Sequence, residues 1–397
     1  MKRVLLTIVA ASAALYALSV VWAKNRQAAG LDFYIYFVNA QLAARTDVEN
    51  IYASDTQDRI GEEYYARAAA GRSELRKYDA QRRRRLDNVS SPFLYTAFRW
   101  VSRDYDRALL QDHVLLLAAF IIGVLLIARR AAVPLWCALL LLAALLLWYR
   151  GFEADLRVGN VNSLQLLGLG AALSAPPLVA GAILGLLFAF KPNVLFVVLL
   201  FIVARIAQRD WRRLRLELGG GAIGVAIAIV AAAINYRSLH VWTQWVARAN
   251  EFYHRIPTRA ERNVTPLLAL YHQHGATVSH LVALALFAVA AIALLRARRA
   301  DDALVAGTGM LIYLLSATVV WLHYLVLVVP LALALLRRRA TAAIALLALV
   351  ALAEVPYEWL THKPAFDVEG TLVGVSLFAL FASAVYAMSD RRPRAAV

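Results

Sequence analysis

An acidic residue lies in an aromatic stretch that follows the first apolar segment of the chain. This residue is Asp32, in the sequence Gly30-Leu31-Asp32-Phe33-Tyr34. A carboxylate that apolar neighbours partly desolvate is suited to take a proton from a hydroxyl group, which is the role of a general base. The same position, just ahead of a helix-like run, also suits a residue that caps the N-terminus of a helix. The sequence alone leaves both interpretations of Asp32 open.

Two basic residues, Lys191 and His323, have similarly apolar surroundings. Lys191 interrupts a long apolar stretch just before Pro192, and an ionisable residue at membrane depth is costly and therefore a candidate for function. The helix break at the proline would equally let the ammonium group extend to the membrane surface. His323 lies between Trp321 and Tyr324, a position typical of an interfacial residue in an aromatic belt.

Two amide side chains, Asn160 and Asn162, follow Gly159 just ahead of another apolar run. A glycine followed by two amides can bring backbone and side-chain donors to a polar ligand. The same residues are equally typical of an ordinary helix start with amide caps. This pattern is therefore weak support for a binding site.

Other patterns give little support to metal or nucleotide chemistry. The triplet from Asp104 to Asp106 has the D-x-D form that some sugar-nucleotide enzymes use to hold a cation, but such a triplet arises easily in a charged loop. His272 and His274 alternate without a matching cluster of Cys, His or Asp, so we predict no metal site and no cofactor. The chain has no P-loop and no HExxH motif, which argues against ATP-driven transport and zinc proteolysis.

The elements that position these residues are predicted to be membrane helices, because the composition is unusually apolar. Hydrophobic residues make up 61% of the 397 residues and charged residues 17%, whereas soluble domains have about 45–50% and about 25%. The formal net charge of +16 then indicates basic loops that set topology and contact anionic lipid. We expect a lipid bilayer and no nucleic acid as partner. The single cysteine, Cys137, excludes a disulfide framework.

Twelve apolar runs predict an all-α polytopic membrane protein with about twelve transmembrane helices. Because proline ends or kinks helices, the region 161–207 is predicted to form three short helices joined by tight turns. Five of the six even-numbered runs end in basic clusters, at 129–130, 205–215, 296–299, 337–339 and 391–394, whereas odd-numbered runs end in aromatic segments such as 354–359. This pattern predicts that both termini are cytoplasmic. The twelve runs are 4–23, 112–128, 133–149, 161–174, 177–190, 193–207, 219–234, 279–295, 303–320, 324–336, 341–353 and 371–388.

With this topology, residues 1–397 form a single membrane domain with two long segments outside the cytoplasm. Residues 24–111 are predicted to be the first periplasmic loop, with juxtamembrane helices, and residues 235–278 the second. Aromatic stripes in the first loop, such as Phe33 to Phe37, predict helices lying in the membrane interface. The run Arg82-Arg83-Arg84-Arg85 is predicted to face solvent or lipid headgroups, because four adjacent like charges cannot converge on one phosphate.

Four elements along the chain together resemble the bacterial membrane glycosyltransferases of family 87. The resemblance covers about residues 30–330, and all four elements fall on the predicted outer face. Asn160 stands where the family has a glutamine, and Ser91-Pro92 stands where it has two prolines. In chain order the elements are Asp32-Phe33 with Tyr36, then Ser91-Pro92-Phe93-Leu94, then Gly159-Asn160-Val161-Asn162 with Gly181, Gly185 and Phe190-Lys191-Pro192, and last Trp321-Leu322-His323-Tyr324.

The resemblance implies a GT-C fold, in which the first extracytoplasmic loop lies over a cavity open to the lipid. It also implies an inverting transfer of a sugar, mannose- or arabinose-like, from a polyprenyl-phosphate donor to a hydroxyl of a glycan or glycolipid on the periplasmic side of the inner membrane. No metal ion is required on this scheme. By analogy Asp32 is the catalytic base, and Asp32, Lys191 and His323 are expected to meet in one site. The candidate contacts to the donor phosphate are Lys191, His323, Arg150 and Arg157, and those to the substrates are Tyr36, Asn160, Asn162 and Tyr324.

A transporter or flippase for a lipid or amphiphile is the alternative from another functional class. It would share the helix count and the basic loops. Such a protein is expected to contain inverted repeats with helices broken at the midplane. The two halves of this sequence show no convincing symmetry, and the long first loop has no counterpart in the second half. A non-enzymatic assembly subunit also stays open on the sequence alone.

Overall fold

Helices make up nearly all of the regular structure in the computed structural model. The structure describes residues 2–43, 45, 47–258, 263–297, 301–353 and 368–389. Within these ranges there is no β-strand. Two isolated β-bridges pair Tyr149 with Ala353 and Asn263 with Trp321. The predicted end segments at 354–359 and 391–394 lie outside the described residues, as does part of the cluster at 296–299.

Five of the described helices are long and apolar enough to cross a membrane by themselves. These are α1 (Lys2–Asn25), α6 (Tyr105–Arg130), α12 (Trp211–Tyr236), α15 (Thr277–Ala297) and α20 (Val368–Ser389). Shorter apolar helices include α7 (Leu135–Trp148), α16 (Asp302–Ser316), α17 (Val329–Leu336) and α18 (Arg339–Ala351). The prediction of a helical polytopic membrane protein is therefore confirmed, whereas the count of twelve spans stays a prediction.

The region 161–207 forms three short helices, as its prolines predicted. They are α9 (Asn162–Ser174), α10 (Pro177–Phe190) and α11 (Leu195–Gln208), and the short 3-10 helix η1 (Pro192–Val194) precedes α11. Pro176 is the N-cap of α10 and Pro192 is the first residue of η1, positions where a missing backbone N–H costs no helical hydrogen bond. Lys191 is thereby the residue between α10 and η1, and its backbone is extended, with φ −156° and ψ 112°.

Glycines bring α10 and α12 into close contact along much of their length. A Cβ atom on Gly181 would lie 2.0 Å from the backbone oxygen of Glu217, and one on Gly185 would lie 2.2 Å from that of Gly221. On the other helix, a Cβ on Gly224 would lie 2.1 Å from the backbone oxygen of Ala182. Gly181 and Gly185, which belong to the resemblance with family 87, therefore serve helix packing, as small residues do between membrane helices.

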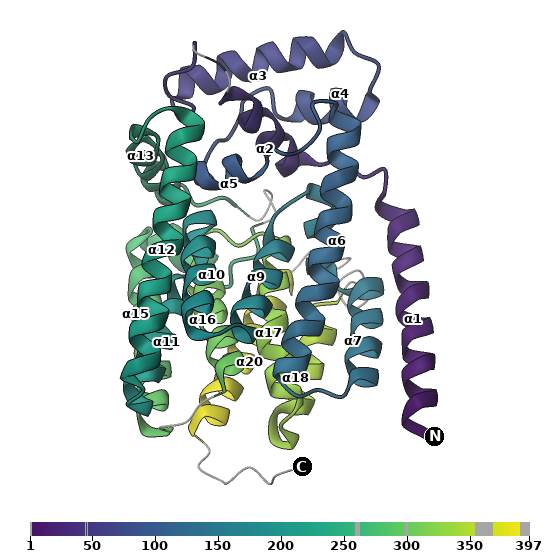
Figure 1. The fold of residues 1–397 in the computed structure, drawn as a ribbon, viewed down its shortest axis with the longest axis vertical. Helices are drawn as coiled ribbons and strands as arrows, with labels where there is room; N and C mark the ends of the chain where they lie inside the picture. Colours follow the sequence, from purple (N-terminus) through teal and green to yellow (C-terminus); the bar gives the residue numbers. More distant parts are fainter. Residues whose placement is uncertain are drawn as a thin grey trace.

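Basic helix ends meet at one end of the molecule in a buried ion network. Arg205, in the last turn of α11, pairs with Glu217 of α12 at 3.0 Å and with Asp302 of α16 at 2.8 Å. Arg213 of α12 and Arg130 of α6 also reach Asp302, at 2.7 Å and 3.5 Å. The last turns of α6 and α11 therefore lie beside the first turns of α12 and α16. This arrangement agrees with the prediction that successive helices run in opposite directions. In Figure 1 the start of α1 and the end of α20 lie at this same end.

The opposite end of the molecule carries a layer of shorter helices (Figure 1). They are α2 (Leu31–Leu42), α3 (Ser54–Ala69), α4 (Glu74–Arg82), α5 (Pro92–Ala97), α13 (His240–His254) and α14 (Leu268–His274). Phe33, Tyr34, Tyr36 and Phe37 of α2 are all buried in one cluster beneath α3 and α4. These rings contact protein, and the placement of the helix in the plane of the membrane interface stays a prediction. α2 is largely apolar, with Asp32, Asn39 and Gln41 as its polar residues, and the rest of the layer covers it.

Candidate functional site

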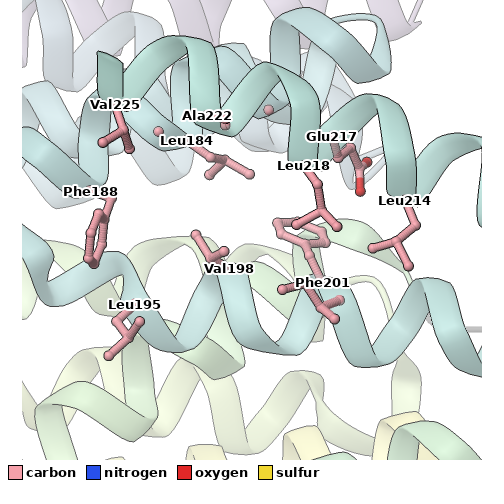
Figure 2. Close-up of a pocket in the computed structure, with 14 residues that line it drawn as sticks. Leu184, Phe188, Leu195, Val198, Phe201, Leu214, Glu217, Leu218, Ala222 and Val225 are labelled. Atoms are coloured by element: carbon pink, nitrogen blue, oxygen red, sulfur yellow. The ribbon is translucent and has the colours of Figure 1, made fainter. Parts of the chain in front are cut away.

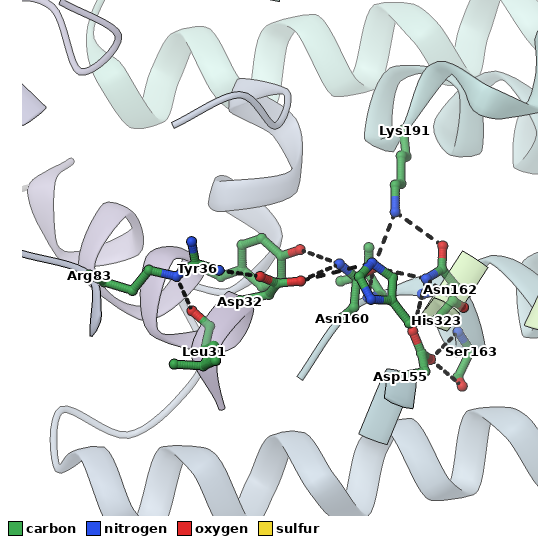
Figure 3. Close-up of polar contacts among 11 residues, drawn as sticks. Leu31, Asp32, Tyr36, Arg83, Asp155, Asn160, Asn162, Ser163, Lys191 and His323 are labelled. Carbon is green, nitrogen blue, oxygen red and sulfur yellow. Dashed lines mark hydrogen bonds and ion pairs between the residues drawn. The ribbon is translucent and has the colours of Figure 1, made fainter. Parts of the chain in front are cut away.

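Four segments that are far apart in the sequence meet at the boundary between the outer layer and the long helices (Figure 3). They are the start of α2, the turn from α8 (Arg150–Val158) to α9, the break between α10 and η1, and the start of η3 (Leu322–Val328). Each is a place where a helix begins or ends. Backbone groups at such ends lack helical partners, and here side chains from the other segments fill that role.

Asp32 lies in the first turn of α2 but does not cap it. The N-cap residue is Gly30, and no side chain provides a capping hydrogen bond. One carboxylate oxygen of Asp32 accepts a hydrogen bond from Arg83 Nη2 at 2.7 Å, and the other accepts one from Asn160 Nδ2 at 2.7 Å. The side chain is 21% exposed. The capping interpretation is thus wrong, and Asp32 instead joins the outer layer to the helices below.

Arg83 departs from the prediction made for the run of four arginines. Arg82 lies over the ring of Tyr78, Arg84 pairs with Glu62, and Arg85 pairs with Asp58, all on the outer layer. The guanidinium of Arg83 instead turns inward to Asp32, and its Nε donates to the backbone oxygen of Leu31 at 3.1 Å. The prediction that the whole run faces headgroups or solvent is wrong for Arg83, because it follows the last residue of α4, where the chain turns over α2.

Asn160 links the acidic and the basic parts of the site. Its Nδ2 donates to Asp32, and its Oδ1 accepts from Lys191 Nζ at 3.1 Å. The Tyr36 hydroxyl lies 3.4 Å from the same Nδ2. The preceding residue, Gly159, has a φ of +66°, and a Cβ atom there would lie 2.5 Å from the Cβ of Phe33. Only glycine combines this left-handed conformation with such a close approach, so Gly159 fixes where Asn160 points.

Asp155 is a buried acid that the sequence analysis did not select as a site residue. Its carboxylate accepts hydrogen bonds from the Ser163 backbone N–H at 2.9 Å, from the Ser163 hydroxyl at 2.6 Å and from Asn162 Nδ2 at 2.9 Å. Burial raises the Asp155 pKa to about 6, although these hydrogen bonds and the charge of Lys191 lower it. Its place seven residues before Asn162 was the available signal, since an acid there can cap the next helix.

Lys191 points into the site rather than toward the membrane surface (Figure 3). Its Nζ donates to Asn160 Oδ1 and to Asn162 Oδ1, the latter at 3.0 Å, and lies 4.2 Å from the centre of the Tyr324 ring. Burial lowers the Lys191 pKa to about 8, against the opposing effect of the Asp155 and Asp32 charges. The interpretation of Lys191 as a residue that extends to the membrane surface is wrong.

The element Ser91-Pro92 supports the break that carries Lys191. The Ser91 hydroxyl donates to the backbone oxygen of Phe190 at 2.9 Å and also caps α5 by accepting from the Leu94 backbone N–H. The carbonyl of Phe190 lies at the end of α10, where helical hydrogen bonding stops. This contact explains why the two matching elements, far apart in the chain, belong to one site.

His323 brings an unpaired polar atom to the site. Its Nε2 lies 4.0 Å from an oxygen of Asp32 and, among the described residues, has no hydrogen-bond partner although the side chain is only 9% exposed. Its backbone oxygen accepts from Asn162 Nδ2 at 3.1 Å, and its ring packs edge-on against Tyr324. Buried polar groups are normally satisfied, so an unpaired Nε2 beside a carboxylate indicates a place for a polar ligand.

Arg150 and Arg157, the two other predicted contacts to the donor phosphate, both lie on α8. Arg150 begins α8 and is half-buried, whereas Arg157 is exposed in its last turn. The described hydrogen bonds that link Asp32, Asn160 and Lys191 involve neither arginine. The network does include the four predicted substrate contacts, which are Tyr36, Asn160, Asn162 and Tyr324.

The remaining sequence patterns have structural roles in the described part of the chain. Asp104 caps α6 by accepting from the Arg107 backbone N–H, and Asp106 accepts from the Ser73 hydroxyl. Tyr105 between them donates to Asp79. The described residues contain no group of three or more His, Cys, Asp or Glu side chains placed to hold a metal ion. The D-x-D triplet thus joins α6 to the outer layer.

An apolar groove of about 300 Å³ runs beside this site between α11 and α12, with α10 as its floor (Figure 2). One end is formed by Phe188 and Leu195, and Leu214 and Glu217 are at the other (Figure 2). Phe188 and Leu195 flank Lys191 in the sequence, so the groove begins at the helix break that carries the ammonium group. Thirteen of the fourteen lining residues are glycine, alanine or larger apolar residues, and the exception is Glu217.

Comparison with known protein families gives one match. The model described as glycosyltransferase family 87 matches residues 91–319, more than half of the chain. This range includes Asp155, Asn160 and Lys191, whereas Asp32 lies well before its start and His323 just beyond its end. No curated protein and no solved structure matches the chain.

Proposed function

The chain belongs to glycosyltransferase family 87, and from this premise we propose that it transfers a sugar from a polyprenyl-phosphate donor to a hydroxyl group of a glycan or glycolipid. The observation that supports this most is the convergence of Asp32, Lys191 and His323 around Asn160. A carboxylate and an ammonium group held apart by one amide suit a reaction that takes a proton on one side and releases a phosphate on the other. The implied GT-C fold is part of the same proposal.

In the proposed reaction Asp32 takes the proton from the acceptor hydroxyl. The acceptor oxygen forms a bond to the anomeric carbon while the bond from that carbon to the phosphate oxygen breaks, and the configuration of the carbon inverts. Polyprenyl phosphate leaves with its own negative charge. A base must lie within about 3 Å of the hydroxyl in the substrate complex, and the 21% exposure of Asp32 leaves it accessible. The scheme uses no metal ion.

Lys191 and His323 are proposed to bind the donor phosphate. Lys191 has three N–H donors, two of which bond the amide oxygens of Asn160 and Asn162. His323 Nε2 has no partner in the described part of the chain. Charge-assisted hydrogen bonds to a phosphate are stronger than those to neutral acceptors, so these groups favour the leaving phosphate. Tyr36 and Tyr324 are the proposed contacts to the sugars.

The apolar groove is the proposed binding site for the isoprenoid chain of the donor. It starts at Phe188 and Leu195, on either side of the break that carries Lys191 (Figure 2). A chain in the groove would therefore present its phosphate to the ammonium group. Apart from Glu217 at its far end the lining is apolar, which suits a branched hydrocarbon.

A transfer assay with purified protein in lipid nanodiscs tests this function. We expect transfer from polyprenyl-phosphate mannose or arabinose to an oligosaccharide, and none from the corresponding nucleotide sugars. A donor shortened to one isoprene unit is expected to have a KM at least tenfold higher, because it cannot fill the groove. Transfer from a nucleotide sugar at an equal rate would contradict the proposed donor. Donor movement across vesicles without any glycosyl product would instead support a flippase.

The outer layer is proposed to face the periplasm, with both termini in the cytoplasm of a bacterial inner membrane. Arg72 is exposed between α3 and α4, so Arg72→Cys in a Cys137→Ser background places one reactive thiol on this layer. We expect an impermeant thiol reagent to label it in intact spheroplasts. A matched cysteine at Arg212, exposed near the start of α12, is expected to react only after lysis. The reverse pattern would contradict the proposed orientation.

A further inference from the structure

A second cleft, of about 410 Å³, opens between α3 and α4 in the outer layer, away from the groove between α11 and α12. We propose that this cleft binds a neutral oligosaccharide, as an accessory site for the glycan part of the acceptor. The proposal rests on the proposed function, because the acceptor supplies the class of ligand. The cleft is lined by Tyr65, Ala69, Glu74, Lys77, Tyr78 and Gln81.

Two tyrosines provide the apolar surfaces of the cleft. Tyr65 comes from α3 and Tyr78 from α4, and Tyr78 is 46% exposed although its ring is large and apolar. The guanidinium of Arg84 lies 4.5 Å from the centre of the Tyr65 ring, and that of Arg82 lies 5.5 Å from the centre of the Tyr78 ring. Each arginine covers only one ring face. Tyr65 also packs against the hydrophobic cluster of the outer layer, so the ring face available to the C–H face of a sugar is that of Tyr78.

The polar groups of the cleft suit a ligand without charge. Lys77 Nζ donates to Glu74 Oε1 at 2.8 Å, so the two charges cancel. Gln81 adds an amide that both donates and accepts hydrogen bonds. Sugar hydroxyl groups also donate and accept hydrogen bonds, so they can pair with Glu74, Lys77 and Gln81. The one cation among the lining residues, Lys77, is already paired with Glu74, so the lining itself offers no unpaired charge to a phosphate or an anionic lipid headgroup.

The cleft is also connected to the catalytic site through α4. Tyr78 and Gln81 lie in the last two turns of this helix, and Arg83, just beyond its end, pairs with Asp32. The helix rises about 6 Å over the four steps from Tyr78 to Arg82. Arg84 and Glu62 form two hydrogen bonds of 2.8 Å between the segment after α4 and α3, which hold the two walls together. A glycan in the cleft would therefore have its end near the proposed base.

Binding of fluorescent mannohexaose and arabinohexaose to the full-length protein in nanodiscs, without donor, tests the proposal. At least one of the two is expected to bind, and Tyr78→Ala and Gln81→Ala are each expected to weaken its binding at least tenfold. Both side chains are exposed, so the variants should keep the wild-type Tm. Tyr16→Ala, which removes a tyrosine 66% exposed on α1, is the matched control and should bind as the wild type does.

The same variants separate this proposal from the proposed function. Transfer to a monosaccharide acceptor should be unchanged in Tyr78→Ala and Gln81→Ala, whereas the KM for the hexasaccharide should rise at least tenfold. If neither hexasaccharide binds the wild type at millimolar concentration, or if both variants bind like the wild type, the proposal is overturned. Competition by inorganic phosphate or by anionic vesicles, lost in the variants, would overturn it in favour of an anionic ligand. Failure of all transfer, with hexasaccharide binding intact, would overturn only the proposed function.

Discussion

The Asp32→Asn protein is expected to lose sugar transfer by a factor of about 10²–10⁴, the usual contribution of a positioned general base. The amide keeps the size of the carboxylate but cannot take the proton from the acceptor hydroxyl. It still accepts one hydrogen bond from Arg83 or Asn160 in place of the two that Asp32 accepts. The loss of one hydrogen bond to a charged group costs about 1.5–3 kcal/mol of folding stability, so Tm should fall moderately while the protein stays folded and keeps its affinity for the donor.

Asp87→Asn is the matched control for this variant. The Asp87 carboxylate is 40% exposed and lies 3.8 Å from Arg83 Nη1, the same guanidinium that pairs with Asp32. The Asp87→Asn substitution removes one negative charge beside Arg83, as Asp32→Asn does, but leaves the contact between Asp32 and Asn160 in place. We expect near wild-type transfer from Asp87→Asn, measured as product formed per minute under saturating donor. If Asp32→Asn transfers sugar as fast as Asp87→Asn, Asp32 is not the base.

The Lys191→Met protein is expected to bind the donor roughly ten- to hundredfold more weakly, because a hydrogen bond from a charged group contributes about 1.5–3 kcal/mol. Methionine keeps an unbranched chain of similar length but removes the charge and the bonds to Asn160 and Asn162. The maximal rate should also fall, since the leaving phosphate loses its cation. Lys24→Met is the matched control, because Lys24 lies in the last turn of α1 and pairs with Glu153.

The pH dependence of kcat/KM gives an independent test of Lys191. Burial lowers the Lys191 pKa to about 8, while the charges of Asp155 and Asp32 act in the opposite direction. The ammonium group is therefore present below about pH 8 and is lost as the pH rises above it, so kcat/KM should decline on the alkaline side. Lys191→Arg stays charged throughout this range, and its alkaline decline should disappear. An unchanged decline in Lys191→Arg would assign that titration to another group.

Membrane helices were predictable because each depends mainly on its own residues. The apolar runs, the breaks at Pro176 and Pro192, and the basic ends at Arg130 and Arg205 are local features, and the described helices follow them. The resemblance to family 87, later shown by the family match, likewise rested on short elements in chain order. The aromatic stripe of α2 did not reveal that protein covers it, because a largely apolar helix has a similar composition whether lipid or protein covers it.

The site itself depended on contacts across the whole chain. By itself the sequence determined that Asp32, Lys191 and His323 lie near helix ends on one face. The lengths of the apolar runs and the proline breaks set the depth of each residue relative to the membrane. Only the tertiary structure decided that Asn160 lies between acid and lysine, that Arg83 alone of four identical neighbours turns inward, and that Asp155 holds the turn. The four arginines have the same chemistry, so the sequence cannot distinguish them. The direction in which each side chain points depends on where α4 ends above α2, and that is set by tertiary packing.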